Sequence, residues 1–295
     1  MDMILISLAV HENVDVVVDQ IENINKYIPG SQVMLHISRD FYRSYGNEIV
    51  NVLKIFENVH INEISLNTGY LDGSVLAAHL SNLKQAIKLN LNYSYILIVG
   101  SNEMYVRHGV IDYIELYDCS LGWSREEHVQ YDDGFGRAFN DPILRKLLKN
   151  NSIKLIKRAP EGTFYSRELF ENSPLYKLLY SSKYHLIMSF YNIEILSFLR
   201  KKIITPLARV LHKLKVFNPF SFLSYATEEF YIPSLMLSEG KNSVLPVCYM
   251  DWEHDLVVDI QTIKSVNAGS IKGKFSVKRV ERKVNDPVRK YINSL

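Results

Sequence analysis

Two groups of charged residues in the second half of the sequence could do chemistry. Glu229 closes the segment Thr227–Glu229, and a carboxylate within hydrogen-bond reach can take a proton from a hydroxyl group. A basic run near the C-terminus could attract an anionic group. Its members are Lys278, Arg279, Arg282 and Lys283. Both groups also fit ordinary structural roles, because acidic residues begin many helices and charge runs usually form solvated surfaces.

The first hundred residues predict the framework that must position these side chains. Strand-like and helix-like patterns alternate there, which is typical of a mostly parallel sheet covered by helices. The expected strands are residues 4–8, 32–37, 59–64 and 95–99, and the expected helices are residues 14–28, 49–56 and 74–89. Ligands bind outside the carboxyl ends of such strands. The residues that follow those ends and are expected at a binding site are Ser38, Gly69, Ser101 and Asn102.

The composition and net charge of the sequence are those of a globular protein without an overall basic surface. The 295 residues are 47% hydrophobic and 22% charged, as in an ordinary globular chain, and we expect one domain spanning residues 1–295. The alternating pattern ends near residue 115, so we distinguish a first part, 1–115, from a second part, 116–295. A formal charge of +2 gives no global basic field, so we expect no nucleic-acid partner. No signal peptide or membrane-spanning segment is evident, which predicts a cytoplasmic protein.

Residues 200–215 form a strongly basic segment. It contains six Lys or Arg residues and no acid, and helical spacing places Leu207, Val210, Leu211 and Leu214 on one face. This pattern predicts a basic amphipathic helix beginning near Pro206. Two interpretations are open: the apolar face packs on the domain, or the helix meets the anionic surface of a membrane.

Short motifs recur along the chain from about residue 4 to residue 292. They are His36-Ile37-Ser38, Thr68-Gly69-Tyr70, Val99-Gly100-Ser101-Asn102, Glu161-Gly162-Thr163-Phe164-Tyr165-Ser166-Arg167, Ala226-Thr227-Glu228-Glu229-Phe230, Tyr249-Met250-Asp251-Trp252 and Val280-Glu281-Arg282-Lys283-Val284. In order and spacing they resemble the core-2/I-branching β-1,6-N-acetylglucosaminyltransferase family, which includes peptide O-xylosyltransferases and many bacterial relatives. Two departures stand out: Ser38 replaces an Asp of the family pattern, and the motif at 161–167 is shortened.

The resemblance implies a single GT-A-like, Rossmann-like α/β domain and an inverting glycosyltransferase that uses no metal. It makes Glu229 the catalytic base and assigns Lys283, Arg282 and Arg279 to the diphosphate of a nucleotide-sugar donor. The nucleotide-binding residues would be Ser38, Gly69, Ser101 and Asn102. The acceptor-binding residues would be Trp252, Asp251, Trp123, Arg125 and Glu161. His36 and His79 are expected to be core histidines.

The resemblance also suggests the substrates. UDP-N-acetylglucosamine is the first donor to expect, with UDP-xylose, UDP-glucose and UDP-galactose as alternatives, and no other cofactor. The acceptor would be a glycan, lipid-linked, in bacterial O-antigen, capsule or lipopolysaccharide synthesis, with residues 200–215 at the inner membrane surface. Two other functions stay open: a catalytically silent carbohydrate-binding or scaffold protein with this fold, and a metal-dependent GT-A enzyme using Asp251 or Asp132–Asp133.

Overall fold

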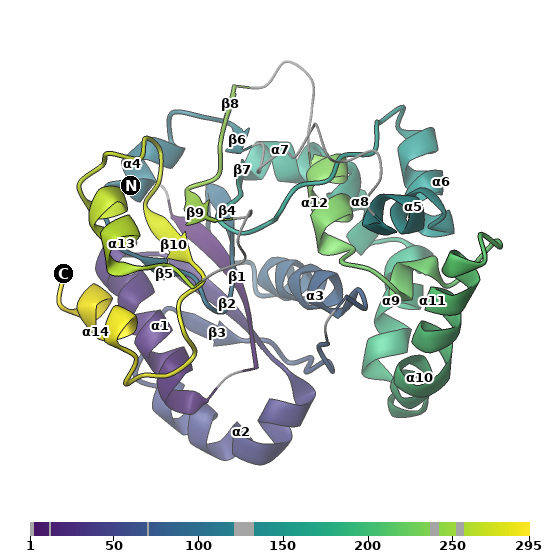
Figure 1. The fold of residues 1–295 in the computed structure, drawn as a ribbon, viewed down its shortest axis with the longest axis horizontal. Helices are drawn as coiled ribbons and strands as arrows, with labels where there is room; N and C mark the ends of the chain where they lie inside the picture. The colour runs from purple at the N-terminus through teal and green to yellow at the C-terminus, as the bar shows by residue number, and fades with distance from the viewer. Residues whose placement is uncertain (1–2, 12, 70, 121–132, 237–241, 252–256) are drawn as a thin grey trace.

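The structure is a computed structural model, and it describes all residues except 1–2, 12, 70, 121–132, 237–241 and 252–256 (Figure 1). The strands are β1 Ile4–Val10, β2 Gln32–Ile37, β3 Val59–Ile61, β4 Tyr95–Val99, β5 Met104–Tyr105, β6 Cys119–Ser120, β7 Phe164–Ser166, β8 Ser243–Val244, β9 Cys248–Met250 and β10 Ser276–Lys278. The helices are α1 Val14–Tyr27, α2 Arg39–Leu53, α3 Ser74–Lys88, α4 Val110–Ile114, α5 Asp133–Phe139, α6 Pro142–Asn150, α7 Arg167–Asn172, α8 Pro174–Leu179, α9 Ser182–Asn192, α10 Glu194–Leu199, α11 Thr205–Lys213, α12 Glu228–Met236, α13 Ile260–Asn267 and α14 Pro287–Asn293. A π-helical turn covers Arg200–Ile204, and a 3-10 turn covers Ser221–Leu223.

A seven-stranded sheet in the order β3-β2-β1-β4-β7-β6-β8 forms the framework. The first four strands of this order are parallel, and β7 runs antiparallel to both β4 and β6. Helices flank the sheet on both faces, with α1 and α2 on one side and α3 on the other (Figure 1). The predicted α/β architecture with a mostly parallel sheet is confirmed.

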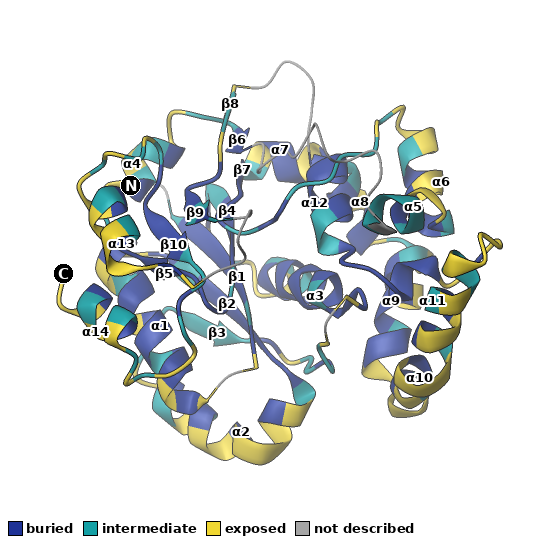
Figure 2. Cartoon of the chain, viewed as in Figure 1, coloured by how far each residue is buried: buried dark blue, intermediate teal, exposed yellow. Residues whose placement is uncertain are grey.

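Alternate residues of each central strand pack into different hydrophobic cores. Along β1, Leu5 joins the core beneath α3, while Ile4 and Ile6 join the core beneath α1 and α2. Side chains of a strand point alternately to the two faces of the sheet, so both faces of β1 are buried. Figure 2 shows the central strands as buried over most of their length. This double burial gives the apolar runs that made these strands predictable.

Two of the expected elements have different boundaries in the structure. The helix expected at 49–56 begins at Arg39, directly after β2, and ends at Leu53. In its first half only Phe41 and Gly46 are buried, so the sequence there lacks an apolar stripe that would reveal the helix. The third strand ends at Ile61 rather than at residue 64.

A second, three-stranded sheet in the order β5-β10-β9 carries the C-terminal segment back to the end of β4. The backbone N–H of Val280 donates to the carbonyl of Asn102 at 2.9 Å. The buried guanidinium of Arg289 on α14 forms an ion pair with Asp19 on α1, which fixes the last helix against the first. The basic run is therefore held next to the strand ends of the first half.

The basic segment forms part of a longer helix than expected. Helical structure is continuous from Glu194 to Lys213, through α10, the π-helical turn and α11, and the predicted start near Pro206 was wrong. Proline lacks the N–H that continues an α-helix, and the π-helical turn directly before Thr205 locally changes the hydrogen-bond pattern. Together with α9, this helix forms the helical hairpin at the right of Figure 1.

Candidate functional site

An open cleft of about 930 Å³ lies at the carboxyl ends of β1, β2 and β4. Clefts of this size hold small-molecule ligands, and this edge of a parallel sheet is where such ligands bind. The lining includes eight of the residues singled out in the sequence: Ser38, Gly69, Ser101, Asn102, Glu161, Glu229, Arg279 and Arg282. Residues separated by more than two hundred positions in the sequence thus share one cleft.

The first half of the chain supplies neutral groups to the cleft. Ser38 directly follows β2 and is the N-cap residue of α2. The N–H of Gly69 donates to the hydroxyl of Ser74 at 2.7 Å, and that hydroxyl also contacts the carboxylate of Asp72 at 2.5 Å. These bonds fix the loop that leads into α3. The result is a wall of backbone and small side chains suited to a neutral ligand group.

Hydrogen bonds to the buried side chains of Gln20 and Glu103 hold the turn that follows β4. The N–H of Gly100 donates to Oε2 of Glu103 at 3.1 Å, and Nε2 of Gln20 donates to the carbonyl of Gly100 at 2.8 Å. Burial raises the pKa of Glu103 to about 7, although hydrogen bonds from Ser276 and Gly100 oppose that shift. This network gives the backbone around Ser101 a fixed position.

Gly100 is needed for space. A Cβ atom there would lie 3.0 Å from Cγ of Glu161 and 3.4 Å from Nζ of Lys278. Those two side chains form an ion pair over the end of β4. Burial alone would raise the pKa of Glu161, but the charge and hydrogen bond of Lys278 outweigh burial and lower it. The cleft therefore contains an ion pair in which the charges of Glu161 and Lys278 compensate each other.

The basic run reaches the cleft through three of its side chains. Lys278, Arg279 and Arg282 all line it, and Nη2 of Arg282 donates to the hydroxyl of Ser101 at 3.1 Å. This contact joins the basic run to the turn after β4. Positive charges fixed at that place could stabilise the negative charge of a phosphate group.

Two adjacent carboxylates at the start of α12 lie in the same cleft. Burial, together with the neighbouring charge of Glu229, raises the pKa of Glu228 to about 8. Oε2 of Glu228 has no hydrogen-bond partner among the described residues. Oε2 of Glu229 lies 3.7 Å from Nζ of Lys157, whose positive charge compensates the carboxylate. Glu229 is thus placed where an ionised carboxylate can accept a proton from a ligand hydroxyl.

Some predicted site residues lie elsewhere. Lys283 is exposed in the segment before α14, and Asp251 follows β9; neither lines the cleft. Trp123, Arg125 and Trp252 lie outside the described residues. The roles expected of these five residues stay predictions.

Lys278, Glu228 and Lys157 were missed as site residues by the sequence analysis. Lys278 was noted only as a member of the basic run, although Phe275–Lys278 alternates apolar and polar residues as a strand does. That strand pattern could have indicated that Lys278 is anchored by a sheet. No comparable signal marks Lys157, because its approach to Glu229 depends on tertiary packing.

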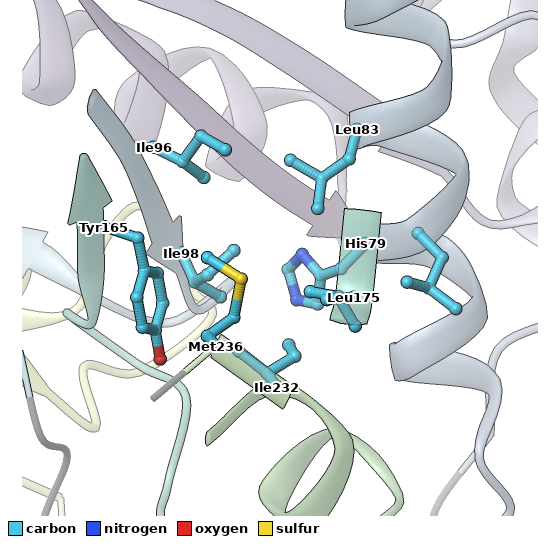
Figure 3. A pocket seen from close by; sticks show the side chains of 9 residues that line it. His79, Leu83, Ile96, Ile98, Tyr165, Leu175, Ile232 and Met236 are labelled. Atoms are coloured by element: carbon cyan, nitrogen blue, oxygen red, sulfur yellow. The ribbon is translucent and has the colours of Figure 1, made fainter. Parts of the chain in front are cut away.

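A second, small pocket of about 10 Å³ shares His79 and Ile98 with the cleft and is lined almost entirely by apolar side chains (Figure 3). His79 lines both pockets, and its Nδ1 lies 2.9 Å from the hydroxyl of Ser7. Burial lowers the pKa of His79 to about 4 and that of His36 to about 3. Both are core histidines, as predicted. The small pocket is a packing gap with little more room than one water molecule needs.

The described part of the chain contains neither a cluster of metal-ligating side chains nor a membrane-spanning helix. No three His, Cys, Asp or Glu side chains come together there in a way that could hold a metal ion. The pair Asp132–Asp133 falls outside the described side chains. In the same part of the chain, no helix is both long enough and apolar enough to cross a membrane.

Comparisons with known proteins point to synthases of glycans. The chain is 24% identical to the chondroitin synthase of Pasteurella multocida (strain Pm70) over 169 residues, or 55% of this chain and 17% of that protein. It is 30% identical to the hyaluronan synthase of Pasteurella multocida over 98 residues, or 31% of this chain and 10% of that protein. The chain thus spans less than a fifth of the length of either relative.

Comparisons with solved structures and with protein families give weaker similarity than the two synthases do. The crystal structure of S. aureus TarS 1-349 matches with a TM-score of 0.33 and 12% identity, over 58% of this chain and 49% of that one. No protein-family profile matches the sequence. The similarity to bacterial synthases is therefore distant, and the resemblance to the core-2/I-branching family stays a prediction.

Proposed function

We propose that the protein is a glycosyltransferase that moves a sugar from a nucleotide-sugar donor to a hydroxyl group of a glycan acceptor. Chondroitin and hyaluronan are glycans, so the synthases that share sequence with this chain support sugar transfer. The observation that carries the proposal is the cleft, which combines the carboxylates of Glu228 and Glu229 with the positive charges of Lys278, Arg279 and Arg282. Sugar transfer needs both a proton acceptor and a site for a diphosphate.

In this proposal the donor lies along the carboxyl edge of the sheet, as in a GT-A fold. The nucleoside occupies the neutral wall that contains Ser38 and Gly69. The diphosphate lies at the turn after β4, where Arg282 already contacts Ser101. Side chains with fixed positive charge can take the place of a metal ion, because the leaving diphosphate chiefly needs charge compensation.

The chemical step inverts the anomeric carbon. Glu229 takes the proton of the acceptor hydroxyl as its oxygen forms a bond to the anomeric carbon. The bond from that carbon to the diphosphate oxygen breaks, and its electron pair leaves with the diphosphate. Attack from the face opposite the leaving group converts an α-linked donor into a β-linked product. Nζ of Lys157, 3.7 Å from Oε2 of Glu229, places a positive charge beside this carboxylate.

The substrates follow from the same proposal. UDP-N-acetylglucosamine is the first donor to test, with the acceptor a lipid-linked glycan of bacterial O-antigen, capsule or lipopolysaccharide synthesis. Glu161 lines the cleft and is a candidate to bind an acceptor hydroxyl. The basic segment at residues 200–215 would bring the protein to the membrane surface where such an acceptor is held.

Thermal unfolding with a panel of UDP-, GDP-, CMP- and dTDP-sugars tests the donor site. A ligand present at about 100 times its Kd adds about 2.7 kcal/mol to the free energy of unfolding. We expect a UDP-sugar to raise Tm in EDTA, and Arg282→Ala, which should weaken binding about tenfold, to remove about half of that shift. No shift with any nucleotide sugar would contradict the proposal, and a shift that requires Mg²⁺ or Mn²⁺ would contradict metal independence. Donor binding without transfer to any glycan would favour a silent carbohydrate-binding protein.

A further inference from the structure

The long helix of the hairpin carries a row of exposed apolar side chains. We call this row the outer stripe; its members are Ile195, Phe198, Ile203, Leu207, Val210 and Leu214. Each is 50–72% exposed, and Val216 and Phe217 continue the apolar surface beyond the end of α11. Figure 2 shows α10 and α11 as largely exposed on their outer side. Isolated surface hydrophobic residues are normal, but a contiguous set marks an interaction surface.

The π-helical turn keeps the outer stripe on one face. Successive members are three or four residues apart, except for Phe198 and Ile203, which are five residues apart across Arg200–Ile204. A π-helical turn contains about one residue more than an α-helical turn, so it absorbs this extra residue. The opposite side of the same helix is buried at Ser197, Arg200, Thr205 and Ala208. The helix thus has one packed face and one apolar face without a described partner.

The packed face is anchored firmly to the domain. Arg200 is fully buried and forms an ion pair with Asp72, and the hydroxyl of Tyr191 on α9 donates to the carbonyl of Asp72 at 2.7 Å. Arg200 was expected on a basic surface, and this was wrong because its charge is used inside the fold. With the inner face fixed in this way, the outer stripe cannot turn inward to bury itself.

Positive charge borders the outer stripe. Four exposed lysines lie on the helix or just beyond its end: Lys201, Lys202, Lys213 and Lys215. Glu194 is the only acidic residue between positions 194 and 217. A second copy of this chain would bring these lysines against one another across a two-fold axis, which is unfavourable. An anionic surface satisfies both the lysines and the apolar side chains.

The surface lies beside the opening of the cleft. Nζ of Lys201 is 3.4 Å from Oδ2 of Asp40, and Nη2 of Arg209 donates to the carbonyl of Leu71 at 3.1 Å. Both Asp40 and Leu71 line the cleft. A flat anionic surface in contact with the hairpin would therefore lie next to the site where the acceptor must enter.

We infer that the outer stripe and its lysines dock the protein on the surface of an anionic lipid bilayer. The apolar side chains insert among the headgroups, and the lysines contact the lipid phosphates. The docking deepens the proposed function by presenting the cleft to an acceptor held in the same membrane, and it rests on that function only for what enters the cleft. Vesicle binding itself needs neither donor nor acceptor.

Co-sedimentation with vesicles tests the docking. The probes are vesicles of phosphatidylcholine alone and of phosphatidylcholine mixed equally with phosphatidylglycerol. We expect the wild-type protein to bind the mixed vesicles at least tenfold more tightly. Phe198→Ser, Leu207→Ser and Leu214→Ser combined should lower that binding at least tenfold, and so should Lys202→Glu with Lys213→Glu. Equal binding of both vesicle types, or unchanged binding by either variant, would overturn the inference.

Two controls separate this outcome from others. Ile55→Ser with Leu116→Ser removes apolar side chains of similar exposure, 71% and 64%, from other parts of the surface and should leave vesicle binding unchanged. Light scattering without lipid should show the same molar mass for the wild type and the triple serine variant. If the wild type were a dimer and the triple serine variant a monomer, a second copy of the chain would be the partner of the outer stripe. That result would overturn bilayer docking. Thermal shift with UDP-sugars, which is independent of vesicles, reports on the proposed function separately.

Discussion

The two walls of the cleft differ in the kind of group that they contribute. The wall built by the first half is made of backbone and neutral side chains such as Ser38, Gly69 and Ser101, with Asp40 as its one carboxylate among the described lining residues. The wall built by the second half contributes the other carboxyl groups and the cations. They are Glu161, Glu228, Glu229, Lys278, Arg279 and Arg282.

This difference separates recognition from charge chemistry. Ends of parallel strands hold the backbone rigidly, which suits the recognition of a neutral nucleoside. Charged groups cost free energy when they lose water, and they are tolerated in a cleft only with partners or with a shifted pKa. The second half shows both solutions, the Glu161–Lys278 ion pair and the raised pKa of Glu228. Substitutions in the wall built by the second half should therefore affect turnover. Substitutions in the wall built by the first half should affect nucleotide preference.

The largest effect is expected at Glu229. Glu229→Gln keeps the shape of the side chain but removes its ability to accept a proton. Loss of a general base lowers turnover by about 10²- to 10⁴-fold. We expect a fall in this range in kcat, with the UDP-sugar Kd changed less than threefold. Measured initial rates within tenfold of the wild type would remove Glu229 from the role of base.

The next effect is on stability, through the Glu161–Lys278 pair. Lys278→Met leaves a carboxylate without its cation in a place where the two side chains are only 18% and 12% exposed. Breaking such a pair costs about 2–3 kcal/mol, somewhat less than for a fully buried pair. Denaturant unfolding at neutral pH should show this loss, and Glu161→Gln with Lys278→Met should regain most of it.

The pH dependence of the Lys278→Met effect follows from the lowered pKa of Glu161. A carboxyl whose pKa is lower in the folded state contributes stability above its unfolded pKa, and that contribution disappears as pH falls through the folded pKa. The difference in free energy of unfolding between the wild type and Lys278→Met should therefore shrink in acid. A difference that stays constant down to low pH would indicate lost packing rather than a lost ion pair.

A smaller effect is expected for donor binding at Arg282. Replacing it with Met removes a charge-assisted hydrogen bond, which is worth about 1.5–3 kcal/mol, or roughly 10- to 150-fold in Kd. Because Arg282 is exposed, we expect the lower end, about tenfold, in calorimetric titration with UDP. Lys290→Met on the exposed side of α14 is the matched control and should leave the Kd unchanged. Equal effects of both variants would indicate only a general electrostatic attraction.

The smallest effect concerns Glu228. Its pKa of about 8 in the folded state exceeds the value of an unfolded Glu, so the free energy of unfolding falls as pH rises from the unfolded pKa towards 8 and levels off above that pH. Glu228→Gln stays neutral and should therefore gain stability relative to the wild type as pH rises from 6 to 9. We expect a relative gain on the order of 1 kcal/mol in urea unfolding. A relative gain that decreases over this range would contradict the raised pKa.

The degree to which the site was predictable also differs between the walls. Ser38, Gly69, Ser101 and Asn102 were located because they follow strands that short-range patterns revealed, and all four line the cleft. In the second half, charge alone singled out Glu229, Arg279 and Arg282 without separating a site from an ordinary charged surface, and only the family resemblance assigned them and Glu161 to a site. Lys157 and Glu228 gave no distinct signal, because their proximity to Glu229 or to the cleft depends on how α12 packs.

The sequence by itself determined the alternation of strands and helices between Ile4 and Val99, because hydrophobic periodicity is a property of neighbouring residues. It also determined that residues 200–215 are basic and contain an amphipathic helix, although not where that helix begins. Only the tertiary structure decided that the apolar face with Leu207 and Leu214 points outward, while Arg200 is buried against Asp72. Which face of a helix is covered depends on contacts between residues far apart in the chain, and a local pattern contains no information about those contacts.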